Sequence, residues 1–335
     1  MKYVQFLGDS QIEVREKPSP RPGTGEALVQ ITLSAICGSE IHSLIDGVDL
    51  VVYHGANNTG HEMVGMAVEV PPGSPIQQGQ RVGVNIMQGC GKCVYCLNGD
   101  PVHCPRLRVH HNAHSDYVVV PVSCLVPLPE DLDWDASVLM CGDTLGTPYH
   151  ALKRMGGVHS AQRAAIFGCG PIGIGCLVWM KYFGLYTIVS EISPYRRELA
   201  RRLGADLVLD PAAEDVVAHI RDATNGGPEI CLDCAGVQET TSHALDATGI
   251  YGRVGFIGEK KLAAIKLSPH ILRKELTIFG SWYFTNAEFY EQVEFYRRGL
   301  PIAGLITHRY TLDQAPEAYR CFRAGETGKA VFHHP

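Results

Sequence analysis

Residues 163–180 read RAAIFGCGPIGIGCLVWM, in which a short apolar run is followed by a glycine-rich turn and then by apolar residues at helical spacing. The turn matches the pattern G-x-G-x-x-G. In such a turn Gly168 permits the tight bend, Gly170 lets the backbone approach a pyrophosphate, and Gly173 lets the helix pack closely on the strand. The N-terminus of the helix then faces the anion. The stretch predicts a strand–turn–helix unit that binds a dinucleotide, with contacts from Gly168, Gly170, Pro171, Ile172 and Gly173.

A glycine-rich turn alone is weak evidence, because such turns also occur as purely structural connections. The context strengthens it, since Glu191 ends the next strand-like run, near the expected separation of about 20 residues. A carboxylate at this position accepts hydrogen bonds from ribose hydroxyls and repels a 2′-phosphate, which favours NAD over NADP. Arg196 and Arg197 follow closely, and an arginine here can hold that phosphate, so NADP stays an alternative. For Arg197 we favour the simpler interpretation of a solvated residue on a helix surface.

The middle of the chain alternates strand-like and helix-like segments. The expected strands are 163–168, 186–191, 205–210, 229–236, 252–258 and 276–282, and the expected helices are 170–184, 194–205 and 214–226. This alternation predicts an α/β fold, a Rossmann domain with a doubly wound parallel sheet. Residues 164–180 have no charge, but they fall short of the ~20 apolar residues that span a bilayer.

The N-terminal part is β-rich. Its β-branched runs, which Pro and Gly separate, lie at 26–37, 63–70, 80–87 and 115–128. Near the C-terminus the pattern predicts a helix over 286–299 and a strand over 327–334, but periodicity does not assign this part to a domain. With 335 residues, 45% of them hydrophobic, the chain suits two folded domains.

Charge and composition exclude several partners. The formal net charge is −6 and no block of Lys or Arg stands out, which argues against nucleic acid or a membrane as partner. Residues 1–14 alternate like a strand and contain no apolar run typical of a secretory signal. We therefore expect a cytoplasmic protein, whose thiols stay reduced.

Four cysteines fall within the short stretch GCGKCVYCLNGDPVHCP at 89–105. They are Cys90, Cys93, Cys96 and Cys104. Tight turns at this spacing let the thiolates converge on one ion, and four sulfurs complete a tetrahedron around zinc. Such a closed site leaves no position for substrate, so we predict a structural zinc in a lobe over about 88–106. Disulfides or thioredoxin-like redox chemistry are the weaker alternatives.

A second set of metal-ligand residues is dispersed. It comprises Cys37, the pair His61-Glu62, and Asp143. One thiolate, one imidazole and one carboxylate would leave zinc an open fourth position, which is the arrangement of a catalytic site. Spacing alone does not establish the set, because each residue also has an ordinary structural interpretation.

The motifs resemble the zinc-dependent medium-chain dehydrogenase/reductase (alcohol dehydrogenase) family, nearer its polyol (sorbitol-type) and threonine dehydrogenase branch. The matching pieces, in family order, are C-G-S-E-I-H at 37–42, G-H-E at 60–62, the four-cysteine lobe, G-D-T-L-G-T at 142–147, G-C-G-P-I-G at 168–173 and K-E-L-T-I-F-G at 274–280. The resemblance implies a GroES-like catalytic domain over 1–144, a Rossmann domain over 145–281, and a return to the catalytic domain over 282–335. It also implies two zinc ions per chain, NAD, and a homo-oligomer, either a tetramer or a dimer.

By this resemblance Cys37 and His61 are ligands of the catalytic zinc. The third ligand in the family is Cys, Asp or Glu, a few residues before a Thr or Asn and an aromatic or apolar residue. Asp143 fits, with Thr147 and Tyr149 following. Cys141 is the competing candidate. Glu62 would be a nearby carboxylate that orients His61 or moves onto the metal.

The resemblance also assigns the chemistry. The zinc is a Lewis acid for a bound alcohol, and the alcohol carbon passes hydride to the nicotinamide. Ser39 would touch the substrate oxygen, and His42 would relay the proton to solvent. Further cofactor contacts are expected from Arg196, Thr147, Ile257 and Ser281.

Two segments depart from the family pattern. The stretch DGVDLVVYHGANNTGHE at 46–62 is unusual, so we expect a remodelled pocket entrance. The usual G-G-F-A-E-Y is replaced by NAHSDY at 112–117. His110, His111 and His114 lie in or just before it, and we expect surface histidines, with metal ligation as the alternative.

We therefore predict a zinc-dependent oxidoreductase that transfers hydride between NAD and a secondary alcohol of a polyol, sugar or cyclitol. The alternative substrate class is a threonine-type β-hydroxy amino acid. A zinc-free quinone or enoyl reductase and a non-catalytic NAD sensor are the other hypotheses.

Overall fold

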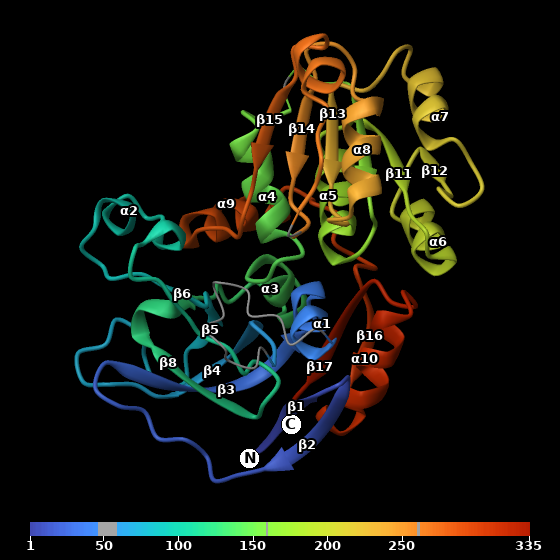
Figure 1. Ribbon diagram of the computed structural model, residues 1–335. Helices are drawn as coiled ribbons and strands as arrows, with labels where there is room; N and C mark the ends of the chain where they lie inside the picture. The colour runs from blue at the N-terminus through green and yellow to red at the C-terminus, as the bar shows by residue number, and fades with distance from the viewer. Residues whose placement is uncertain (46–58, 159, 260–261) are drawn as a thin grey trace.

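The middle of the chain forms a six-stranded parallel sheet with the order β12-β11-β10-β13-β14-β15 (Figure 1). Its strands are β10 (Arg163–Phe167), β11 (Tyr186–Ser190), β12 (Leu207–Leu209), β13 (Ile230–Asp233), β14 (Arg253–Phe256) and β15 (Thr277–Gly280). The structure is a computed structural model that describes residues 1–45, 59–158, 160–259 and 262–335. The strand order changes direction between β10 and β13, which is where such sheets bind ligands. The predicted Rossmann sheet is confirmed.

Helices cover both faces of this sheet. They are α5 (Pro171–Tyr182), α6 (Pro194–Arg202), α7 (Val216–Ala223) and α8 (Gln238–Ala247). The apolar residues of α5 and α6 pack with Ala164 and Ile166 of β10, whereas α7 and α8 pack with Ala165 and Phe167. Successive side chains of a strand point to opposite faces of the sheet, so neighbouring residues of β10 meet different helices. Because helices cover both faces, β10 is apolar at each of these positions.

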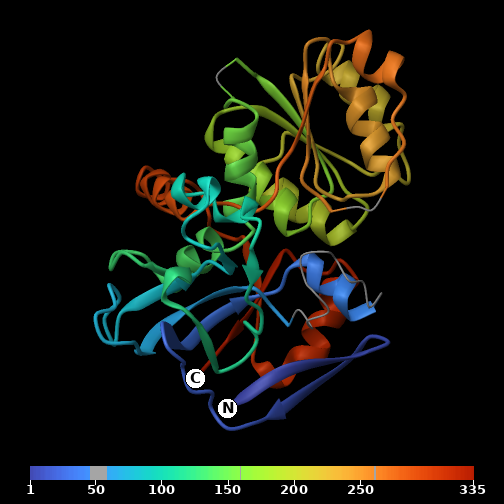
Figure 2. The same ribbon diagram turned by 60° about the vertical axis from the view of Figure 1, so that its left-hand side comes forward.

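A second, largely antiparallel sheet unites the two ends of the chain. Its order is β16-β17-β3-β4-β5-β9, and β8 pairs with β3. The strands are β3 (Glu26–Ala35), β4 (Glu62–Glu69), β5 (Arg81–Val84), β8 (Tyr117–Pro121), β9 (Leu125–Pro127), β16 (Ile306–Tyr310) and β17 (Lys329–His333). Because β17 pairs with β3, the C-terminal segment belongs to the N-terminal sheet. Figure 2 shows both termini at the same end of the molecule.

One segment that we expected to form a single strand forms two strands. The run 115–128 forms β8 and β9, separated by the short helix η2 (Val122–Cys124). Pro121 ends β8, and a proline has no N–H with which to continue the ladder. The chain then crosses from β3, the partner of β8, to β5, the partner of β9.

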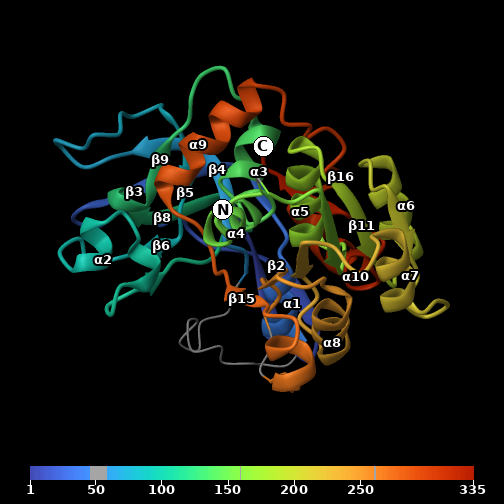
Figure 3. The same cartoon turned by 90° about the horizontal axis from the view of Figure 1, so that it is seen from above.

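The remaining elements surround the two sheets. They are the hairpin β1 (Lys2–Gly8) and β2 (Gln11–Glu16), β6 (Met87–Gln88), β7 (Arg108–Val109), α1 (Gly38–Ile45), α2 (Val94–Leu97), α3 (Trp134–Met140), α4 (Gly146–Arg154), α9 (Asn286–Arg297), α10 (Ala315–Arg323), η1 (Pro101–His103), η3 (Leu267–Leu272) and η4 (Leu312–Gln314). Seen from above, the lobe with α2 lies at the periphery, on the opposite side from α6 and α7 (Figure 3). No helix in the described ranges is long and apolar enough to cross a membrane.

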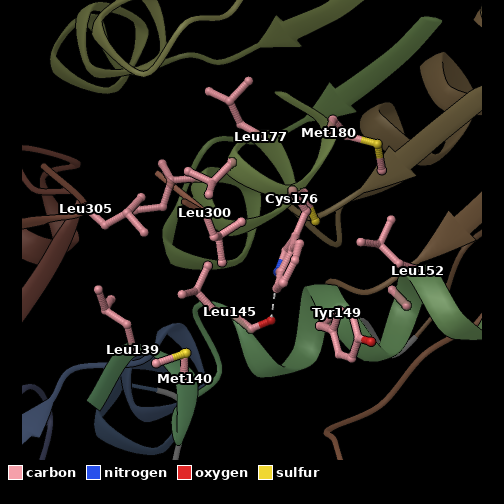
Figure 4. Packing of buried hydrophobic residues seen from close by; sticks show 14 of the residues in the cluster. Leu139, Met140, Leu145, Tyr149, Leu152, Cys176, Leu177, Met180, Leu300 and Leu305 are labelled. Carbon is pink, nitrogen blue, oxygen red and sulfur yellow. Dashed lines mark hydrogen bonds between the residues drawn. The ribbon is translucent and has the colours of Figure 1, made fainter. Parts of the chain in front are cut away.

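An apolar core joins α3, α4 and α5 to the residues that follow α9. Figure 4 shows its side chains pointing toward one another; the labelled ones are Leu139, Met140, Leu145, Tyr149, Leu152, Cys176, Leu177, Met180, Leu300 and Leu305. Within it Trp179 donates a hydrogen bond from Nε1 to the carbonyl oxygen of Leu145, at 3.1 Å. A Cβ at Gly175 would lie 1.6 Å from the carbonyl oxygen of Thr144, so only glycine permits this approach. The core therefore holds the segment around Asp143 against the helix that follows the glycine-rich turn.

Candidate active site

Three of the predicted metal-binding side chains converge. Cys37 follows β3 and His61 precedes β4, and the antiparallel pairing of these strands places the two residues side by side. Asp143 lies between α3 and α4. Its Oδ2 is 3.0 Å from Nε2 of His61 and 3.4 Å from Sγ of Cys37. Together with a carboxylate oxygen of Glu62, these ligand atoms all lie within 4.8 Å of one another.

The electrostatics of this group suit a cation. Burial lowers the pKa of His61, but the Cys37 thiolate and the Asp143 carboxylate outweigh burial and raise that pKa well above its usual value. Burial and the nearby Asp143 raise the pKa of the Cys37 thiol. The thiolate form of Cys37, buried beside the Asp143 carboxylate, therefore needs a positive partner. A sulfur, a nitrogen and an oxygen donor at these separations fit zinc.

Cys141, the competing third ligand, faces elsewhere. Its Sγ packs where a Cβ on Gly83 would lie, and burial raises the pKa of its thiol. Among the described residues it is in neither of the two clusters that could hold a metal. Asp143 also accepts a hydrogen bond at Oδ1 from Thr147, at 3.0 Å, which orients its other oxygen toward His61.

Lys329 of β17 was not singled out in the sequence, yet it is buried against Glu62 of this site. Its ammonium donates to Oε1 of Glu62 at 2.5 Å and to the carbonyl oxygen of Ile36 at 3.0 Å. Within the part of the chain that the structure describes, Oε2 of Glu62 has no hydrogen-bond partner. Burial raises the pKa of Glu62 to about 7, although Lys329 opposes the shift. Lys329 therefore holds one oxygen of Glu62 and leaves the other beside the metal-binding group.

Glu40 of α1 is a second residue that the sequence analysis missed. Its Oε1 accepts the backbone N–H of Cys37 at 2.9 Å and lies 3.9 Å from Nδ1 of His61. A carboxylate behind a metal-binding imidazole sets the orientation of the ring. The feature of the sequence that could have indicated Glu40 is its position three residues after Cys37, in the first turn of a helix.

Next to the metal-binding group is a pocket of about 790 Å³ that extends to the glycine-rich turn. Ser39 lines it, and among the described residues its buried Oγ has no hydrogen-bond partner, as expected of an atom that meets a substrate oxygen. The apolar wall here consists of Ile86, Met87, Trp282 and Tyr283. His42 belongs to α1, but its side chain lies outside the described part of the structure, as does most of the unusual segment 46–62.

The glycine-rich turn fits a pyrophosphate. Gly168 has a φ of +91°, which favours glycine. A Cβ at Gly173 would lie 2.0 Å from the carbonyl oxygen of Gly168, so the helix start needs a glycine there. At Gly170 a Cβ would meet Nη1 of Arg196 at 3.7 Å and no other atom of the described residues within 4 Å, so this position is open for a ligand. Pro171 and Ile172 begin α5 and line the same pocket.

Glu191 lies beside this turn. Its Oε2 accepts the N–H of Cys169 at 2.6 Å, and its Oε1 accepts the N–H of Ser193 at 2.8 Å. Each carboxylate oxygen has a second lone pair, so two further donors such as ribose hydroxyls can be accepted.

Both neighbouring arginines are engaged by the protein. Arg196 donates from Nε to the carbonyl oxygen of Thr327 at 2.9 Å and lies against the ring of Phe322. Arg197 pairs with Asp210 at 2.8 Å, so the expectation of a solvated Arg197 is wrong. The guanidinium of Arg197 also donates hydrogen bonds to the carbonyl oxygens of residues 191 and 192, and these bonds fix its position.

Thr147, Ile257 and Ser281 also line the pocket. In the described ranges of the chain the buried Oγ of Ser281 has no hydrogen-bond partner, which fits a polar atom that awaits a ligand. Arg323 of α10 lines the pocket as well and was not predicted.

The four cysteines of the lobe form the other metal-type cluster. The backbone N–H of Lys92 is the main cause that lowers the pKa of Cys90, to about 6. Cys104 Sγ accepts the N–H groups of Cys90 and Arg106, at 3.2 and 3.3 Å. These donors stabilise thiolates, which is the form that binds zinc.

The histidines of the unusual segment are not surface residues. His111 and His114 are buried and His110 is half-buried, so the expectation of surface histidines is wrong. Neither metal-type cluster of the described residues includes them. They are buried because the backbone of 113–114 pairs with residues 59 and 60 beside the active site.

The chain is similar to known proteins over nearly its whole length. Residues 23–130 match the family model described as the alcohol dehydrogenase GroES-like domain, and residues 171–298 match the zinc-binding dehydrogenase model. The L-threonine 3-dehydrogenase of Pyrococcus horikoshii is 31% identical over 96% of this chain and 94% of its own length. The chain belongs to the zinc-dependent alcohol dehydrogenase family, as its motifs predicted, and it is an oxidoreductase of that class.

Two further similarities extend over nearly the whole chain. The L-galactonate-5-dehydrogenase of Escherichia coli is 29% identical over 91% of this chain and 90% of its own length. The solved structure of alcohol dehydrogenase TADH from Thermus sp. ATN1 superposes with a TM-score of 0.89 at 26% identity and covers both chains completely.

Proposed function

We propose that this chain is a cytoplasmic, homo-oligomeric dehydrogenase that uses zinc and NAD to interconvert a secondary alcohol of a neutral polyol, sugar or cyclitol and its ketone. The observation that supports this best is the convergence of Cys37, His61 and Asp143 on one pocket that also receives Glu191 and the glycine-rich turn. In this proposal residues 1–144 and 282–335 form the catalytic domain, and residues 145–281 bind the cofactor.

The chain's own residues divide the work of the reaction. When bound, zinc supplies Lewis acidity at the substrate hydroxyl, and the nicotinamide accepts the hydride. Cys37, His61 and Asp143 would hold the zinc. The Oγ of Ser39, which has no partner among the described residues, would accept the proton of the substrate hydroxyl as it releases its own, and His42 on the same helix would take the released proton onward to solvent. The apolar wall excludes water from the reacting carbon.

The charges around the pocket favour a neutral substrate. Among the described residues that line it, the arginines are Arg196 and Arg323, and both belong to the cofactor end. No lysine appears in that lining, and residues 46–58 contain neither Lys nor Arg in sequence. An α-amino acid carboxylate would therefore lack a fixed cation. Trp282 and Tyr283 instead present aromatic surface to the C–H face of a ring or chain.

A threonine-type β-hydroxy amino acid is the second candidate. The relative from Pyrococcus horikoshii favours it, because that protein is named for L-threonine.

The test is a substrate panel with NAD, in which formation of NADH is followed for polyols, cyclitols, sugars and L-threonine. We expect turnover with a neutral alcohol and none with L-threonine. His61→Ala should abolish turnover and release one of about two zinc ions per chain. Activity on L-threonine alone would replace the substrate class. Full zinc retention in His61→Ala would overturn the metal site, and zinc and NAD binding without any turnover would indicate a sensor.

A further inference from the structure

A buried chain of hydrogen bonds leads away from the metal-binding group. Oε2 of Glu40 lies 3.0 Å from Nε2 of His114, and Nδ1 of His114 lies 2.9 Å from Oγ of Ser34. The same Oγ lies 3.1 Å from Nε2 of His334. All four side chains are buried. They come from α1, the segment after β7, β3 and the C-terminus, so four distant parts of the chain meet behind Cys37 and His61.

The two oxygens of Glu40 have different partners. Oε1 faces Cys37 and His61, whereas Oε2 accepts hydrogen bonds from His114 and from the hydroxyl of Tyr319. A carboxylate can rotate about its last side-chain bond. Donors on Oε2 fix that rotation, and with it the position of Oε1 beside the imidazole.

The contacts at Nδ1 of His114 suit a proton on its other ring nitrogen, Nε2. His334 Nε2–H can donate to Ser34, and the Ser34 hydroxyl can then donate to Nδ1 of His114. In this assignment, made from the hydrogen-bond pattern, Nε2 of His114 has the hydrogen that Glu40 requires. Ser34 and His334 therefore select the useful tautomer.

The backbone reserves the space for this ring. Gly60, next to His61, has a φ of +94°, and a Cβ there would lie 2.7 Å from Nε2 of His114. The N–H of His114 donates to the carbonyl oxygen of Thr59 at 3.0 Å. The ring is therefore placed by the same segment that positions His61.

We propose that His114 is a positioning residue of the active site: through Glu40 it fixes the orientation of the His61 imidazole and of the Cys37 backbone, and Ser34 and His334 keep its tautomer. The inference rests on the proposed role of Cys37 and His61 as metal ligands. It concerns geometry and requires no change of charge on any of these groups.

The test compares three variants of the zinc-loaded enzyme. His114→Phe keeps an aromatic ring but removes both hydrogen bonds, His114→Gln restores an N–H donor at similar reach, and Ser34→Ala removes the group that selects the tautomer. Each is measured for the rate at which a chelator removes each zinc, for the visible spectrum after Co²⁺ replaces zinc, and for kcat and KM. The zinc of the cysteine lobe is the internal reference.

We expect His114→Phe to release the active-site zinc roughly tenfold faster, to change the Co²⁺ spectrum and to lower kcat more than KM. His114→Gln should restore most of each property, Ser34→Ala should show a smaller effect of the same kind, and release from the lobe should not change. A wild-type rate and spectrum in His114→Phe would overturn the inference. Equal acceleration of both zinc ions would also overturn it, because it would show general loosening.

If His114→Phe does not fold, His114→Gln and Ser34→Ala test the inference in its place. The inference would be overturned if Ser34→Ala released the active-site zinc at the wild-type rate and His114→Gln failed to retain that zinc. His61→Ala distinguishes a failure of the proposed function from a failure of the inference about His114. Retention of both zinc ions in His61→Ala contradicts the proposed function, whereas loss of one zinc there with no effect in the His114 variants contradicts this inference alone.

Discussion

The ammonium of Lys329 lies 2.5 Å from Oε1 of Glu62, and both side chains are buried beside the metal-binding group. The two residues are 267 positions apart and join β17 to β4. Removing one partner of a buried ion pair leaves an uncompensated charge, which costs more than the pair itself contributes.

Lys329→Met should therefore lower the free energy of unfolding by about 3–5 kcal/mol, whereas Lys329→Met with Glu62→Gln should recover much of that loss. Urea unfolding of the zinc-loaded enzyme, followed by tryptophan fluorescence, measures both. Lys153 is the matched control, because its pair with Glu291 is exposed and its replacement by Met should cost less than about 1 kcal/mol. A double variant less stable than Lys329→Met would contradict this account.

Replacing Asp143 distinguishes it from Cys141 as the third ligand. Asp143→Ala should abolish turnover and lower the zinc content from about two per chain to about one, because two protein ligands hold zinc poorly. Cys141→Ala is the control and should keep both zinc ions, since its thiol packs near Gly83. Elemental analysis after dialysis gives the count. The reverse pattern would transfer the role to Cys141.

Glu191 should decide the choice of cofactor. Glu191→Ala removes a charged acceptor for two ribose hydroxyls, and hydrogen bonds to charged groups contribute about 1.5–3 kcal/mol. The preference for NAD over NADP should fall about 10- to 100-fold in kcat/KM. Glu198, an exposed residue of α6, serves as the control after replacement by Ala. An unchanged ratio in Glu191→Ala would reject the ribose contact.

His334 should make the fold sensitive to acid. Burial, and to a smaller extent His114 and His333, lowers the pKa of His334 to about 3. In the unfolded chain a histidine titrates near ~6.5, so between about pH 6.5 and pH 3 the unfolded state binds the proton more readily. The folded state consequently loses up to ~1.4 kcal/mol of stability per pH unit in that window, and nothing above it.

His334→Gln should lessen the loss of stability between pH 7 and pH 5 by up to about 2 kcal/mol. Unfolding in urea at each pH measures the difference between wild type and variant. The control is His219→Gln, on the exposed side of α7, which should keep the wild-type profile. A variant with the same acid slope as wild type would show that His334 is not the cause.

The fold of the cysteine lobe should depend on its own zinc, and loss of that zinc should leave the metal site of the active site unchanged. Cys96→Ser should release one zinc and make residues 88–106 accessible to proteases, because three thiolates no longer close the shell. The Co²⁺ spectrum of the remaining site should stay that of the active site. Loss of both zinc ions would contradict the separation of the two sites.

Some elements were within reach of sequence analysis but were not predicted. In α10, Pro316 near the N-terminus and buried Ala318, Tyr319 and Phe322 at helical spacing are ordinary signals of a helix. In α8, Thr240 and Thr241 disfavour a helix, and the helix forms because its apolar residues pack on β13 and its threonine hydroxyls bond to Asp233. Tertiary packing overrode local preference there.

By itself the sequence determined the features whose parts are close neighbours in the chain: the strand, turn and helix at 163–182, the four-cysteine lobe, and the family to which both belong. In these features the spacing of residues along the chain determines their geometry, since a turn or a short loop brings together residues only a few positions apart. The tertiary structure alone decided that Glu40 faces His61, that Lys329 pairs with Glu62, and that His114 is buried behind them. These contacts join residues that are far apart in sequence, and no local period or spacing encodes where separate strands and helices place their side chains once two sheets have packed.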